Sequence, residues 1–242
     1  MTAVSDAILR RATWASFGQP PQVVAAVPLM PDTGPHGLHG TIVNSAAPNY
    51  SFARNARGQG YYGLDGADDR VTLPLTFYDD APDTPGGTTT GFTFVLHARH
   101  RNPVLNDVLF DCRNAAGNRG FYLQYSAVTR LQIIGYQAAG VQYSATEAAN
   151  TQYATQQLCT VFVVDTASGA GRLWHNGDYK TATWAGAATR TTYDPAAVPT
   201  LGSVAGGGSN AEIDVYGAGI WPWPFNRTEA ETIWRLCRDG VL

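Results

Sequence analysis

Hydrophobic and polar residues alternate with a period of two along much of the chain, which is the pattern of β-strands that bury one face. The clearest stretches are 92–99, 121–125, 131–136, 158–165, 171–177 and 212–220. Breakers rich in glycine, asparagine and serine or proline separate them, as at 82–87, 114–118 and 204–210. The pattern predicts an all-β protein built from short antiparallel strands.

Two local signals add a hairpin and a helix. In RLWHNGDYK, Asn176-Gly177 supplies the two positive-φ positions of a type I′ turn, which predicts a two-stranded hairpin. Near the C-terminus, helical spacing predicts a helix over about 229–238, with Thr228 as N-cap and Glu231 completing a capping box. A weaker helical pattern occupies 5–12.

The predicted helix has one apolar face and a defined end. Ile233, Leu236 and Cys237 recur at helical spacing, and Gly240 suits a left-handed stop. One short C-terminal helix is therefore expected beside the strands.

Composition and charge argue against several classes of protein. The 242 residues include 26 glycines and 14 prolines, and a chain of this length fits one β-sandwich domain. The net charge of −3 and the absence of a basic run argue against nucleic-acid binding. The longest apolar run, at 23–30, is too short for a membrane span. Asp6, Arg10 and Arg11 stand where a signal peptide would be apolar, so export by the ordinary route is not expected.

The three cysteines, Cys112, Cys159 and Cys237, show no CxxC spacing. A zinc or redox motif is therefore not indicated, and an odd number leaves at least one thiol free or paired between chains. The simplest expectation is three small buried hydrophobic side chains.

Five blocks in order resemble LamG-like, concanavalin A-like jelly-roll domains. They are DTGPHGLHGTIVN, GYYGLDGADDRVTLP, FTFVLHAR, CTVFVVDTASGAGRLWHNGDYK and EIDVYGAGIWPWPFNRTEAETI, with Leu64 in place of the family's Phe. The resemblance covers residues 22–237. It implies a two-sheet antiparallel jelly-roll sandwich over 21–242, with residues 1–20 as an arm outside the domain.

The arm carries apolar residues beside two arginines. An arm of this kind is expected to contact another chain through Ile8, Leu9 and Trp14, because a solvated tail would expose apolar surface. The alternative is that Trp14 and Phe17 fold back onto the chain's own sandwich.

The strand AEIDVYGAGIW raises the question of catalysis. Some glucanases carry three carboxylates in alternate positions of one strand, but here Tyr216 follows Glu212 and Asp214 in the third position. In the family pattern this strand also closes the sandwich and is structural. No catalytic residue is therefore predicted, and a glycoside hydrolase is the least favoured alternative.

The resemblance also implies a structural calcium where the first and last strands meet. Asp32 and Asp214 are the first choice of ligands. A second candidate is the group Asp65, Asp68 and Asp69 in a glycine-rich turn, where turn formation is the commoner role of aspartate. His36 and His39 lie in a loop motif in which histidine satisfies backbone groups, so metal binding there is less favoured.

Aromatic residues on the predicted hairpin are the best indication of a binding role. Arg172 and Trp174 alternate with Leu173, which matches a core position, so Trp174 is expected to face outward. Tyr179 and Trp184 are near in sequence. An exposed aromatic beside polar groups suits either a sugar ring or a subunit interface, and burial under a loop is a third possibility.

Two classes of function follow from the resemblance. The first is a non-catalytic virion surface protein of a bacteriophage, a decoration, spike or fibre subunit made in the host cytoplasm. Its expected partners are capsid or tail proteins, further copies of itself and glycans, without nucleic acid or membrane insertion. The alternative is an extracellular carbohydrate-binding module of a secreted bacterial protein. The analogy is one of fold, which by itself does not fix function.

Overall fold

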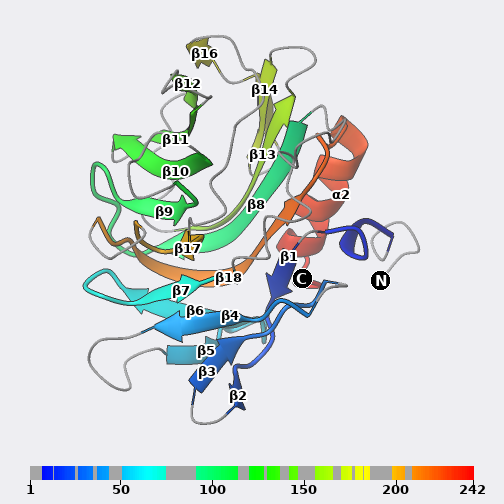
Figure 1. Ribbon diagram of the computed structural model, residues 1–242. Helices are drawn as coiled ribbons and strands as arrows, with labels where there is room; N and C mark the ends of the chain where they lie inside the picture. The colour runs from blue at the N-terminus through cyan, green and yellow to red at the C-terminus, as the bar shows by residue number, and fades with distance from the viewer. Residues whose placement is uncertain are drawn as a thin grey trace.

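Two antiparallel β-sheets face each other in a computed structural model (Figure 1). The first sheet has the order β15 (Asp178–Thr181), β14 (Ala170–His175), β13 (Gln157–Asp165), β8 (Gly91–His100), β18 (Glu212–Trp221), β6 (Gly60–Asp65), β5 (Ser51–Arg54), and β1 (Trp14–Phe17) also pairs with β18. The second has the order β16 (Thr183–Ala185), β12 (Gln142–Thr146), β11 (Arg130–Tyr136), β10 (Gly120–Ala127), β9 (Val108–Asp111), β17 (Thr200–Leu201), β7 (Arg70–Thr72), β4 (Gly40–Val43), β3 (Val27–Met30), β2 (Gln22–Val24). The structure describes residues 7–12, 14–24, 27–34, 37–43, 51–74, 91–113, 120–127, 130–136, 142–146, 156–165, 170–175, 178–181, 183–185, 198–204 and 209–242.

The predicted strands and the predicted sandwich are confirmed. Each of the six alternating stretches lies in a strand over the residues that the structure describes, and β14 pairs with β15 with His175 opposite Asp178. Asn176 and Gly177 themselves lie outside the described residues. None of the described helices is long and apolar enough to cross a membrane.

The first sheet is apolar on both faces at its centre. In β8, Phe92, Phe94 and Leu96 enter the main core between the sheets. On the opposite face, Val95 joins Val161 of β13 in a second core cluster. The sheet can bury both faces because a helix and the N-terminal segment cover the outer one, which relieves these strands of the need for a polar face.

Helix α2 (Arg227–Arg238) covers that outer face at the end of the chain. It begins two residues earlier than predicted: Asn226 is the N-cap, and its capping box is completed by Glu229. Ala230, Ile233 and Cys237 form the buried side of the helix. Gly240 has φ 73°, so the predicted left-handed stop is confirmed.

The N-terminal segment packs onto its own sandwich, which corrects the predicted free arm. Ile8 and Leu9 are in the outer core cluster and Trp14 is in the main core, so none of the three is exposed for another chain. The indole N–H of Trp221 donates to the carbonyl of Ile8 at 2.9 Å. The physical reason is the apolar surface of these large side chains. Packing on the sandwich removes that surface from water, and its burial stabilises the fold.

Strand β1 pairs with the C-terminal half of β18, beyond the residues of β18 that pair with β6. Trp14 is opposite Ile220 and Phe17 is opposite Gly217. A Cβ at Gly217 would come within 2.0 Å of the Phe17 ring, so the glycine makes the close approach possible. The domain boundary at residue 20 stays a prediction, while β1, which precedes it, pairs with β18 of the sandwich.

Candidate functional site

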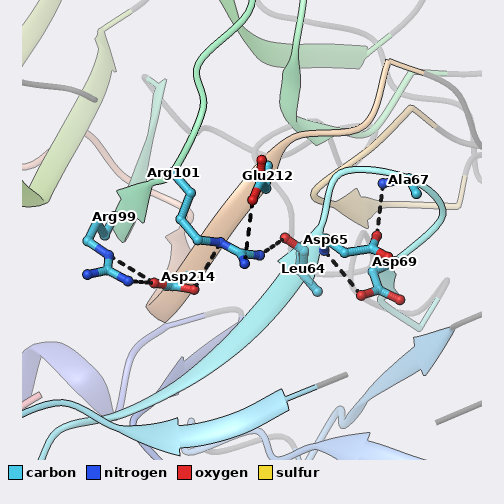
Figure 2. A network of polar contacts seen from close by, with 8 residues as sticks. All are labelled: Leu64, Asp65, Ala67, Asp69, Arg99, Arg101, Glu212 and Asp214. Carbon is cyan, nitrogen blue, oxygen red and sulfur yellow. Dashed lines mark hydrogen bonds and ion pairs between the residues drawn. The ribbon is translucent and has the colours of Figure 1, made fainter. Parts of the chain in front are cut away.

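A network of arginines and carboxylates lies on the outer face of β8 and β18 (Figure 2). Both Nε and Nη2 of Arg99 donate to Oδ2 of Asp214, at 2.9 and 2.5 Å. Nε of Arg101 lies 3.4 Å from Oδ1 of Asp214, and its Nη1 lies 3.5 Å from Glu212. The hydrogen bonds with Asp214 raise the pKa of Arg99 further. Both oxygens of Asp214 thus face guanidinium groups.

The strand that raised the question of catalysis is now accounted for. Asp214 is buried and held by two arginines, and Glu212 contacts one of them. Tyr216, in the third position, packs against Tyr61 with ring centroids 5.1 Å apart. Burial and the nearby Asp214 charge raise the pKa of Tyr216. The three side chains thus contact neighbouring side chains on the sheet and do not point together at a position for a substrate.

Asp32, the other predicted calcium ligand, caps backbone groups of the loop between β3 and β4. Its Oδ1 accepts from the N–H groups of Ala15 at 3.1 Å and Gly34 at 2.8 Å, and its Oδ2 accepts from Leu38 at 2.9 Å. Its own N–H donates to Nδ1 of His39, while His36 lies outside the described residues. Both predicted ligands already have N–H partners, and calcium binding by them stays a prediction.

The second calcium candidate forms a compact group. Asp65, Asp68 and Asp69 each offer an oxygen within 4.8 Å of the others, the one acidic group of this kind in the described part of the chain. Oδ1 of Asp65 accepts from the N–H of Ala67 at 2.8 Å, and Oδ2 of Asp69 accepts from the N–H of Asp65 at 3.1 Å (Figure 2). The turn-forming role predicted for these aspartates is therefore present.

The predicted aromatic contact residues fall in the outer strands of both sheets. Trp174 is the partner of Tyr179 across β14 and β15, and of Val161 across β13. Arg172 lies two positions before Trp174 in the same strand, whereas Trp184 lies in β16 of the other sheet. Their side chains lie outside the described part, so their role as glycan or interface contacts stays a prediction.

A pocket that sequence inspection did not predict opens on the outer face of the first sheet. It has a volume of about 380 Å³ and lies where the turn between β5 and β6 approaches β8, β13 and α2. Its lining combines one indole, several amides, two arginines, an imidazole and two thiols: Asn55, Ala56, Arg57, His97, Gln156, Gln157, Cys159, Trp234, Cys237 and Arg238.

The amides in the pocket are held in a connected network. Nδ2 of Asn55 donates to Gln59 at 2.9 Å and to Gln157 at 3.0 Å. Nε2 of Gln157 lies 2.9 Å from Oε1 of Gln59 and 2.8 Å from Nε2 of His97. Gln59 in turn donates to the carbonyl of Cys237 at 3.1 Å. The network fixes the polar wall of the pocket against the end of α2 before any ligand binds.

The rim of the pocket is aromatic and cationic. Trp234 is half-buried, and the guanidinium of Arg238 lies 4.9 Å from its ring centroid. Nη1 of Arg57 donates to the carbonyl of Arg238 at 3.4 Å. The hydrogen bond to Asp239 raises the pKa of Arg238. An indole beside fixed amides and guanidinium groups can bind a sugar-sized polar ligand.

Nothing local in the sequence indicated this pocket. Asn55 lies in a turn and Gln157 in a strand 102 residues later, and Trp234 comes from the helix near the end of the chain. Trp234 also packs partly against the outer core cluster, so its presence on the helix did not by itself indicate a binding role. The two histidines of β8 lie in different surroundings: His97 lines the pocket, whereas the ring of His100 packs on Tyr125 with centroids 4.9 Å apart.

Comparison with known proteins identifies the fold. No protein-family model matches the chain, and no curated protein sequence matches it. Among solved structures, the receptor-binding domain of botulinum neurotoxin type G superposes with a TM-score of 0.63 at 12% identity, over 93% of this chain and 51% of that chain. The serotype D ligand-binding domain, solved with N-acetylneuraminic acid, gives 0.62 at 11% identity, over 96% and 52%.

A third structure is similar to the same extent. The binding domain of botulinum neurotoxin DC, solved with rat synaptotagmin II, gives a TM-score of 0.63 at 10% identity, over 94% of this chain and 52% of that one. The chain thus spans about half the length of these neighbours. At such identities the likeness establishes the β-sandwich fold, while membership of the LamG-like family stays a prediction.

Proposed function

We propose that the protein is a non-catalytic, lectin-like sandwich that binds carbohydrate in the pocket between the β5–β6 turn, β13 and α2. The observation that carries the proposal is the composition of this pocket. Trp234 offers an apolar face, Asn55 and Gln157 offer amide groups, and about 380 Å³ is a suitable size for one or two sugar rings. The similarity to toxin receptor-binding domains, one of them solved with N-acetylneuraminic acid, supports a sugar ligand.

The charge of the rim favours an acidic sugar. Arg57 and Arg238 are the arginines of the pocket lining, and planar guanidinium groups pair with carboxylates in two-point contacts. N-acetylneuraminic acid carries such a carboxylate and is therefore the first probe. A neutral hexose such as galactose serves as the comparison.

The arrangement of carboxylates supports a non-catalytic role. Hydrolysis of a glycoside requires two carboxyl groups that both reach the scissile bond. Asp214 presents both oxygens to arginines, and Glu212 contacts Arg101. No carboxylate stands in the lining of the pocket as described.

Binding is tested by a glycan array, followed by titration calorimetry with the sugars that bind. We expect Trp234→Ala to weaken binding by roughly tenfold or more, because a stacked aromatic ring contributes about 1–3 kcal/mol. Trp174→Ala is the matched control, since Trp174 belongs to the hairpin site expected from sequence. Loss of binding in Trp174→Ala alone would move the site to the hairpin. Absence of any glycan binding would refute the function itself.

The narrower function, a bacteriophage virion surface protein, is a separate proposal that rests on the sequence. Ile8, Leu9 and Trp14 are buried, so docking to a capsid or tail would use another surface. A fixed ratio of this chain to a capsid or tail protein in purified particles would support the virion role. A native gene that encodes a signal peptide upstream would favour the secreted carbohydrate-binding module.

A further inference from the structure

Two thiols and an imidazole meet at the floor of the pocket. Cys159 and His97 are direct partners across β13 and β8, and therefore lie on the same face of the sheet. Helix α2 covers this face and adds Cys237 from its last turn. All three residues line the pocket and are at most 3% exposed. Residues that are far apart in the sequence thus line one side of the same pocket.

The side chains of Cys159 and Cys237 interact with each other electrostatically, and His97 interacts with Cys237. Nε2 of His97 lies 2.8 Å from Nε2 of Gln157, whereas its buried Nδ1 has no hydrogen-bond partner. Burying an imidazole nitrogen without a hydrogen-bond partner costs free energy. The sulfur of Cys237 is the nearby group with which this nitrogen can interact.

We propose that Cys159 and Cys237 are a redox-active pair that a hydroperoxide oxidises to a disulfide joining β13 to α2. The Cys237 thiolate attacks one peroxide oxygen, the O–O bond breaks, and the leaving oxygen takes a proton to depart as water or alcohol. The resulting sulfenic acid is attacked by the sulfur of Cys159. The S–S bond forms, the S–O bond breaks, and water leaves, so two thiols and one peroxide give one disulfide.

The environment divides the two thiols into an attacking and a resolving partner. Burial raises the pKa of Cys237, but its interactions with Cys159 and His97 outweigh burial and lower the pKa to about 6. Burial and the interaction with Cys237 raise the pKa of Cys159. Cys237 is therefore the thiolate that reacts first, and Cys159 is the thiol that resolves the intermediate.

Both cysteines line the pocket, which is the proposed route of a small oxidant. The third cysteine provides an internal comparison. Cys112 belongs to the main core between the sheets, and its Sγ donates to the carbonyl of Phe121 at 3.1 Å. It is absent from the pocket lining. A reagent that reaches the cysteines of the folded chain through the pocket should therefore spare Cys112.

The inference is tested on the full chain with hydrogen peroxide, followed by mass spectrometry without reductant. We expect loss of the mass of two hydrogen atoms and a tryptic cross-link between the peptide with Cys159 and Leu236–Arg238. Cys112→Ser should still form this cross-link, whereas Cys159→Ser and Cys237→Ser should not. Three free thiols after treatment, or a cross-link that includes Cys112, would overturn the proposal.

A second measurement tests the role of His97 without relying on a disulfide. The rate at which iodoacetamide alkylates Cys237 in folded protein should have its midpoint near pH 6. In His97→Gln the midpoint should move toward the ordinary thiol range of about 8–9. An unchanged pH profile in a folded His97→Gln variant contradicts activation by the imidazole. Neither measurement requires a sugar ligand, so the outcome is independent of the proposed carbohydrate binding.

Discussion

The surroundings of Asp69 disfavour the charged form of its carboxyl group. It is buried, its Oδ2 accepts from the N–H of Asp65, and its Oδ1 has no hydrogen-bond partner. Burial, followed by the charges of Asp65 and Asp68, raises its pKa above 3.8, although the Asp65 N–H and Arg101 act in the opposite direction. The carboxylate is therefore a source of instability at neutral pH.

Replacing Asp69 by asparagine should stabilise the fold. The side-chain oxygen of Asn can keep the bond from Asp65, and its NH₂ group can donate to the neighbouring carboxylates, so we expect a gain of about 1 kcal/mol at pH 7. The direction in which this stability difference changes with pH follows from the raised pKa of Asp69. The cost of the ionised Asp69 is fully present above its folded pKa, shrinks as the pH falls through that pKa, and is gone below the unfolded value near 3.8.

Urea unfolding of Asp69→Asn from pH 7 to pH 3, with a calcium chelator present, measures this difference. Asp68→Asn is the control, because it removes a carboxylate from the same group at a half-exposed position. The same samples with added calcium test the ion site. A calcium-dependent rise in the stability of wild type that Asp69→Asn lacks would mean that the three aspartates serve as ligands.

At the scale of residues, the sequence identified the candidate charged side chains but not the groups that contact them. Asp214 stood out as a carboxylate and a candidate calcium ligand, but the sequence did not show that Arg99, 115 residues away, donates to it. Asp32 likewise stood out as a carboxylate, yet its partners are backbone N–H groups supplied by a loop and by β1. Such pairings depend on which strands become neighbours, and no local pattern encodes them.

Among the elements, helix α2 was located correctly but given the wrong N-cap. The spacing of a capping box occurs twice, from Asn226 to Glu229 and from Thr228 to Glu231. The structure uses the first: the Asn226 side chain accepts from the N–H of Glu229 at 3.0 Å, and Glu229 accepts from the N–H of Asn226 at 2.9 Å.

The two candidate caps give opposite expectations for a pair of variants. Asn226→Ala should lower the free energy of unfolding by about 1 kcal/mol, because the N–H of Glu229 loses its acceptor. Thr228→Ala should change it by only a few tenths, since Thr228 is an exposed position inside the helix. Chemical denaturation of both variants measures the difference. A larger loss in Thr228→Ala would show that the helix begins two residues later in solution.

Strand prediction succeeded for a physical reason that also limited it. Alternation revealed β8, β13 and β18 because their inner residues pack between the sheets. It did not reveal that the outer residues of β8 and β13 are buried as well, under α2 and the N-terminal segment. An apolar outer face resembles a surface patch until the element that covers it is known.

For the whole molecule, the order of strands in the sheets was the part that sequence could not supply. β18, near the end of the chain, pairs with β8, β6 and β1, so it connects segments from most of the chain. The pocket is a product of that arrangement. Its walls come from a turn, two strands and a helix that meet because β13 lies next to β8 and α2 returns over both.

The integration of the N-terminal segment gives a test of the whole fold. Deleting residues 1–16 removes Ile8, Leu9 and Trp14 from the two core clusters and most of β1 from β18. Each large apolar side chain lost from a core costs about 2–5 kcal/mol, so the total is comparable with the stability of an entire domain. We therefore expect the truncated chain to be unfolded or aggregated, as measured by circular dichroism and thermal unfolding.

A shorter deletion of residues 1–6 is the control, because it leaves all of these side chains in place. It should keep a cooperative unfolding transition. If the chain without residues 1–16 instead unfolded at the wild-type temperature, then the segment would contribute nothing to the sandwich. Its apolar residues would then be free to bind another chain, which is the role that their composition first suggested. Burial of Trp14 at 1% exposure in the main core predicts the opposite result.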